Sequence, residues 1–130
     1  MKRLTRLLLP LILMGLTAWA EAPLKDALGL TIDQARQVQE IQAQHRPKFA
    51  AKRQERNREL RVLRRAKLAN DSTQIARQEK ITDKLTEELK QIQMHEDAEI
   101  RRLLTPEQNR KFDDYLKLRK EMVGSSREGF

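Results

Sequence analysis

The 130-residue chain contains no cysteine, which excludes disulfide bonds and metal sites built from thiolates. Aromatic residues make up only 4% of the chain, whereas charged residues make up 35%. This balance is typical of long helices that pack along narrow apolar seams rather than around a thick core. Because narrow seams leave apolar surface uncovered, we expect a homodimer.

The sequence also lacks the motifs of common enzymes. It has no glycine-rich phosphate-binding loop and no nucleophile and base at a recognised spacing. Its carboxylates lie mostly on helix faces that are expected to be solvated. We therefore expect a binding protein and not an enzyme, with no cofactor.

Glycine and proline are absent from the whole of residues 72–103. Apolar residues recur there at helical spacing and predict one long amphipathic helix: Ile81, Leu85, Leu89, Ile92 and Leu103. At 1.5 Å per residue this helix would be about 48 Å long. A compact chain of this size has a radius of gyration of only about 13 Å, so we expect an elongated molecule.

Turn and capping signals divide the rest of the chain. Two Leu-Thr-x-x-Gln motifs each predict a capping box at a helix start, and they consist of Leu30, Thr31 and Gln34, and of Leu104, Thr105 and Gln108. Asn70-Asp71 predicts a turn, and Pro47 either kinks a helix or separates two. We predict an all-α, four-helix elongated hairpin with helices over 31–46, 48–69, 72–103 and 105–123, which pairs into an antiparallel, cradle-shaped homodimer. Residues 21–29 are expected to form a mobile lead-in.

The short turn makes the second and third of these helices antiparallel neighbours. Pairing outward from the turn sets Leu60 near Ile81 and Arg53 near Glu88. It also sets Arg56 near Leu85. Apolar residues then meet apolar residues, and a basic side chain meets an acidic one.

The first twenty residues have the composition of an export signal. Lys2, Arg3 and Arg6 precede an apolar run, and Ala18-Trp19-Ala20 is a pattern that signal peptidase recognises. We expect a cleaved signal peptide over 1–20, a helical domain over 21–123 and a disordered tail over 124–130, in the periplasm of a Gram-negative bacterium. An uncleaved membrane anchor is the alternative. Removal of the signal leaves 24 basic and 19 acidic residues, and the expected compartment argues against nucleic acid as the partner.

The positive charge is concentrated in one segment. Residues 46–67 contain ten basic residues and two acidic ones. In a helix, one stripe of this segment alternates apolar and basic side chains, namely Phe49, Leu60 and Leu63 with Arg53, Arg56 and Lys67. Such a surface can hold an unfolded, partly acidic chain. Alternatively, the aliphatic stems pack along the hairpin while the charged ends reach water.

The two histidines, His45 and His95, are the only metal-ligand candidates of their type. The hairpin register places residue 45 opposite residue 96, close to Glu96 and Glu99. Two imidazoles and a carboxylate could bind Zn²⁺, Ni²⁺ or Cu²⁺. The alternative is that both histidines are seam or border residues, and we assign no metal site on this evidence.

With its two Leu-Thr-x-x-Gln motifs, its export signal and the basic helix between the motifs, the chain resembles the Spy/CpxP family of small periplasmic proteins. It is also similar to the related periplasmic metal-resistance and metal-sensor group that includes CnrX and ZraP. The resemblance covers residues 28–122.

The Spy/CpxP resemblance implies an ATP-independent holding chaperone or envelope-stress adaptor. Its partners would be unfolded or misfolded proteins, and also the periplasmic domain of a sensor kinase. The residues that match a basic concave face are Arg53, Arg56, Arg61, Arg64 and Lys67. The CnrX and ZraP resemblance implies the alternative function of heavy-metal sensing or resistance.

Overall fold

The computed structural model describes residues 22–125, which form four helices and no strand. They are α1 (Ala22–Leu28), α2 (Ile32–Leu68), α3 (Ser72–Arg101) and α4 (Pro106–Ser125). The predicted all-α class is confirmed. The predicted signal peptide and residues 126–130 lie outside the described residues, whereas Gly124 and Ser125, which were assigned to the tail, belong to α4. None of the described helices has the length and apolar character needed to span a membrane.

Pro47 neither ends nor divides a helix. It lies inside α2, which continues for 37 residues and is about 55 Å long. A proline cannot donate a hydrogen bond to the carbonyl group four residues earlier, here that of Ala43. Both Pro47 and Ala43 are exposed, so water can satisfy that carbonyl group. Two separate helices over 31–46 and 48–69 are therefore wrong.

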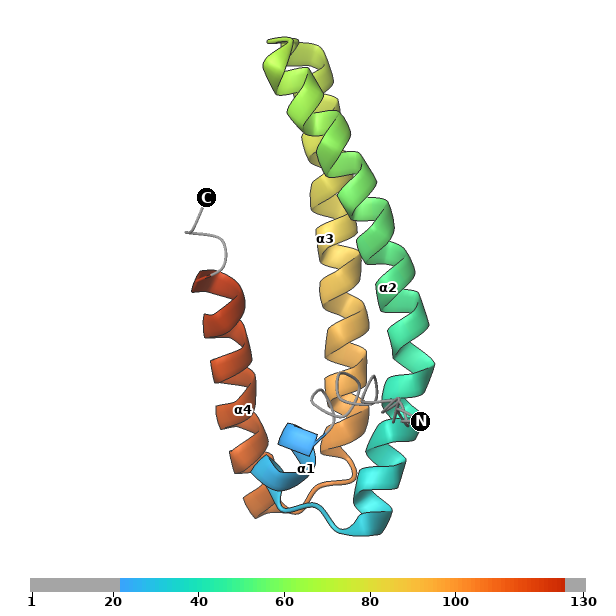
Figure 1. The fold of residues 1–130 in the computed structure, drawn as a ribbon, viewed down its shortest axis with the longest axis vertical. Coiled ribbons are helices and arrows are strands. Elements are labelled where there is room, and N and C mark those ends of the chain that lie inside the picture. The colour runs from blue at the N-terminus through green and yellow to red at the C-terminus, as the bar shows by residue number, and fades with distance from the viewer. Residues whose placement is uncertain (1–21, 126–130) are drawn as a thin grey trace, which may run out of the picture.

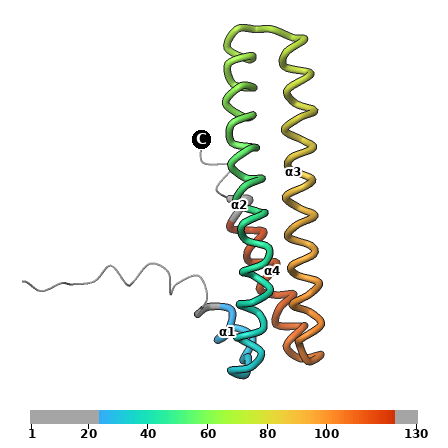
Figure 2. Tube along the Cα trace, turned by 90° about the vertical axis from the view of Figure 1, so that its right-hand side faces the viewer, coloured from blue at the N-terminus to red at the C-terminus, as the bar shows by residue number. Residues whose placement is uncertain are grey.

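α2 and α3 lie side by side and run in opposite directions (Figures 1 and 2). Asn70 allows the reversal because it adopts a left-handed conformation with φ of 53°. The backbone N–H of Asp71 donates to the Ala66 carbonyl, which ends α2. The Asp71 side chain accepts from the Gln74 N–H at 3.1 Å and starts α3, as the sequence predicts.

The seam between α2 and α3 is narrow. Its buried side chains include Leu63, Ala66, Leu85 and Leu89. Lys52, not Arg53, pairs with Glu88, with 2.8 Å between Nζ and Oε2. The predicted partner of Glu88 was thus wrong by one residue, which at about 100° per residue turns Arg53 out of the seam.

The largest apolar core lies at the end of the molecule away from the Asn70 turn. It joins all four helices through Leu24, Leu28, Leu30, Val38, Ile100 and Phe112. The lead-in predicted over 21–29 is therefore wrong for residues 22–28, because Leu24 and Leu28 lie one turn apart and are buried. Gly29 ends α1 with φ of 63°, and the Leu30 N–H donates to the Lys25 carbonyl.

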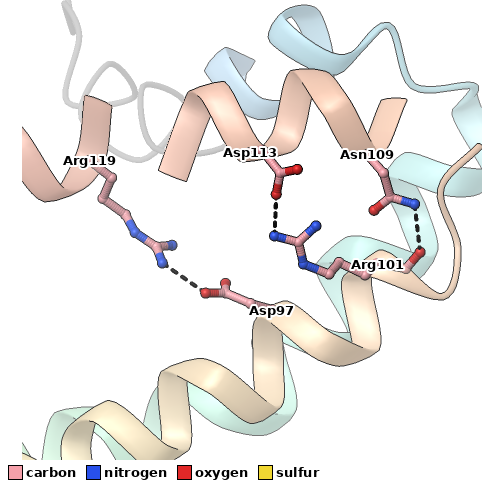
Figure 3. Close-up of polar contacts among 5 residues, drawn as sticks. All are labelled: Asp97, Arg101, Asn109, Asp113 and Arg119. Atoms are coloured by element: carbon pink, nitrogen blue, oxygen red, sulfur yellow. Dashed lines mark hydrogen bonds and ion pairs between the residues drawn. The ribbon is translucent and has the colours of Figure 1, made fainter. Parts of the chain in front are cut away.

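Polar contacts attach α4 to α3 (Figure 3). Arg119 Nη2 donates to Asp97 Oδ2 at 2.9 Å, and Arg101 pairs with Asp113. The Asn109 amide also donates to the Arg101 carbonyl at 3.4 Å. These contacts hold α4 beside the lower part of α3, and α4 does not reach the Asn70 turn (Figure 1).

Candidate functional site

The two Leu-Thr-x-x-Gln motifs form one hydrogen-bonded unit. In each motif the Thr hydroxyl accepts from the Gln N–H and the Gln side chain accepts from the Thr N–H, so both predicted capping boxes are confirmed. The amides of Gln34 and Gln108 also donate to each other, at 2.8 and 3.0 Å. The Gln34 amide also donates to the Leu103 carbonyl, and the Gln108 amide also donates to the Gly29 carbonyl. Each of these carbonyl groups lies two residues before the Thr of the other motif. The motifs thus fix the N-terminal ends of α2 and α4 to each other.

The eight residues predicted to bind clients differ in exposure. Leu63 is buried in the seam and presents no surface to a partner. Phe49, Leu60 and Arg56 are half-buried. The exposed members of the set are Arg53, Arg61, Arg64 and Lys67.

Helical geometry separates these residues further. Six of them lie along one side of α2, next to the seam, and we call this surface the basic flank: Phe49, Arg53, Arg56, Leu60, Arg64 and Lys67. Arg61 lies about 60° or more beyond this group, on the outer side of the helix. The predicted set is therefore not one continuous surface.

The charges of the basic flank are largely uncompensated. Arg56 Nε donates to the Thr86 hydroxyl at 2.7 Å, which ties the half-buried guanidinium to α3. The side chains of Arg53, Arg64 and Lys67 have no hydrogen bond or ion pair with another described residue. Three exposed cations beside half-buried Phe49 and Leu60 are thus available to an external partner.

A groove adjoins the lower end of the basic flank. Arg46, Phe49, Gln93 and Glu96 line it, and its volume is about 170 Å³. Sites for small molecules are usually about 300–1,000 Å³, so this groove fits a single side chain better than a whole ligand.

Glu96 gives the groove a titratable group. Burial raises the pKa of its carboxyl above the ordinary value of 4.5, and the neighbouring Asp97 raises it further. His45, Arg46 and Arg119 partly offset this shift in the pKa. Arg119 belongs to α4, so α4 lies near this groove.

The two histidines have different surroundings. His45 Nε2 lies 3.1 Å from Glu99 Oε2, while His95 is exposed. Within residues 22–125 there is no group of three or more His, Cys, Asp or Glu side chains that could hold a metal ion.

Two groups of this surface were missed from the sequence, Thr86 and Gln93, and Glu96 was considered only as a possible partner of His45. All belong to α3, whereas the basic surface was predicted from the charge pattern of residues 46–67 alone. The predicted hairpin register carried the missing signal, because it already placed residue 85 near Arg56 and residue 96 opposite residue 45. Comparisons with family models, with curated proteins and with solved structures find no match to this chain.

Proposed function

We propose that this protein is an ATP-independent holding chaperone or stress adaptor of the Spy/CpxP type, which acts in the periplasm on unfolded or partly folded proteins. The basic flank is the observation that carries the proposal. It places exposed, unpaired Arg53, Arg64 and Lys67 next to half-buried apolar side chains. Long, flexible cations attract acidic segments, while the aliphatic carbon beside them contacts apolar ones.

An antiparallel, cradle-shaped homodimer belongs to the same proposal. Exposed apolar side chains on α3 and α4 support it, because a second copy would cover them. They are Met94, Leu118 and Met122, with exposed fractions of 52%, 60% and 72%. Small-angle scattering should give an elongated particle of twice the chain mass, and a compact monomer would contradict this part of the proposal.

The chaperone activity is tested by light scattering of a chemically denatured client on dilution, without ATP. The chain should suppress aggregation, and added salt should weaken the effect because it screens exposed charges beyond about 8–10 Å. The triple variant R53Q/R64Q/K67Q should need several-fold more protein for the same suppression. The matched control is R58Q/R61Q/R65Q, which removes equal charge from the outer side of the same helix and should behave like the parent chain. Equal losses in both variants would contradict a specific role of the basic flank.

The metal-sensing alternative is tested by thermal denaturation of the protein with and without metal ions. If Zn²⁺ or Ni²⁺ binds His45, either ion should raise the melting temperature, and His45→Ala should abolish the rise. A melting temperature unchanged by both ions would remove the alternative.

A further inference from the structure

A second row of cations lies on the outer side of α2, away from α3. Arg58, Arg61 and Arg65 follow each other at spacings of three and four residues, and Leu68 continues the row to the end of the helix. These four residues occupy a sector of about 80°, opposite the buried Leu63 and Ala66. We call them the outer stripe.

The outer stripe has no internal charge compensation. All three arginines are exposed, and their guanidinium groups have no hydrogen bond or ion pair with another described residue. The acidic residues nearby are engaged elsewhere, since Glu55 lies 3.7 Å from Lys52 and Glu59 contacts Gln78. Like charges three or four residues apart destabilise a helix. An anionic partner would relieve this repulsion.

Leu68 adds an apolar group to this charge. It is 88% exposed, the highest value among the exposed large apolar side chains of residues 24–122. It lies next to the turn between α2 and α3, at the end of the molecule that neither α1 nor α4 reaches (Figures 1 and 2). A flat object could therefore approach this end without meeting another helix.

We propose that the outer stripe docks on the surface of a membrane that contains anionic phospholipids. The three guanidinium groups would bind lipid phosphates, and Leu68 would insert among the first acyl carbons. The outer side of a helix is convex, which suits a broad, planar anionic surface. A soluble polyanion would satisfy the arginines but would leave Leu68 in water, so the observations favour the membrane.

The absence of cysteine allows a local test with the chain from residue 21, the form expected once the predicted signal peptide is removed. Ala69→Cys, labelled with an environment-sensitive fluorophore, places one probe beside Leu68, and labelled Lys25→Cys places a control probe in α1 at the far end. Vesicles of phosphatidylcholine that contain about 30% phosphatidylglycerol should shift the emission of the residue-69 probe to the blue. The emission of the residue-25 control probe should not shift to the blue. Vesicles of phosphatidylcholine alone should shift the emission of neither probe.

Variants carrying the probe at residue 69 assign the contact. Each arginine near an anionic surface contributes about fivefold to binding, so R58Q/R61Q/R65Q should weaken it about 100-fold. Leu68→Gln should weaken it about tenfold. The control K111Q/K117Q/K120Q removes equal charge from α4 and should keep the parent affinity.

Two results would overturn the proposal. One is an unchanged emission of the residue-69 probe with anionic vesicles. The other is a shift produced by a single-stranded oligonucleotide or by polyphosphate but not by vesicles, which would assign the outer stripe to a soluble polyanion.

Discussion

The side-chain amides of Gln34 and Gln108 donate hydrogen bonds to each other, although 74 residues separate them. Each glutamine also belongs to a capping box of its own helix. Their contact therefore joins the first turn of α2 to the first turn of α4. The two copies of the Leu-Thr-x-x-Gln motif therefore bind each other.

Replacement of Gln34 by Ala should destabilise the protein by about 2–3 kcal/mol. The substitution removes the capping acceptor for the Thr31 N–H, the contact with Gln108 and the donor to the Leu103 carbonyl. Urea unfolding followed by circular dichroism measures the change.

Gln74→Ala is the matched control for this prediction. Gln74 is the third residue of α3, as Gln34 is of α2, but its exposed side chain makes no hydrogen bond within the described residues. Its replacement should change stability by less than about 0.5 kcal/mol. Similar losses in both variants would show that the hydrogen bonds of the Gln34 side chain, in the capping box and with Gln108, contribute nothing measurable to stability.

Arg119→Gln should loosen α4. Asp97 is only 16% exposed and its Oδ2 accepts from Arg119, while its Oδ1 has no hydrogen-bond partner within the described residues. Loss of the guanidinium leaves a largely buried carboxylate without a charged partner, which should cost about 2 kcal/mol. Hydrogen exchange should show that the substitution speeds the exchange of amides in α4 more than that of amides in the α2–α3 seam.

A second substitution distinguishes loss of the ion pair from loss of packing. D97N/R119Q removes the unpaired charge and should recover part of the stability lost in R119Q. No recovery would mean that the aliphatic stem of Arg119, and not its charge, holds α4.

Glu96→Gln should stabilise the protein at neutral pH. Because the pKa of Glu96 is raised in the folded state, folding binds a proton between the ordinary value of 4.5 and the raised pKa. The stability contributed by this group is therefore present below 4.5 and is lost as the pH rises through the folded-state pKa. The advantage of Glu96→Gln should disappear at about pH 4 in thermal melts at a series of pH values. An advantage independent of pH would point to packing in the groove instead.

Local chemistry allowed much of the fold to be predicted. Thr31, Asp71 and Thr105 start helices where the sequence predicts them, because each cap depends on residues only three positions apart. Pro47 and α1 show the limits of such rules. Whether a proline is tolerated in a helix depends on the exposure of the carbonyl group that it leaves free, and α1 is held by burial of Leu24 and Leu28 in a core built from distant residues.

The site was harder to predict than the fold. Leu63 matches the apolar pattern of the basic flank, but its burial depends on the rotation of α2 against α3. Arg61 has the expected charge, but its position in the sequence places it about 60° or more around α2 from the residues of the basic flank. The register placed Glu96 near His45, but its burial in the groove beside Arg46 and Phe49 could not be predicted from the sequence.

Site-specific photocrosslinking tests the central claim most directly. A photoreactive amino acid is placed either at Arg53, on the basic flank, or at Arg58, on the outer stripe. The two positions are close in the chain and lie on two sides of the same helix. With an unfolded client and no ATP, we predict client adducts from position 53 and few from position 58. Equal adducts from both positions, or none from position 53, would contradict the account.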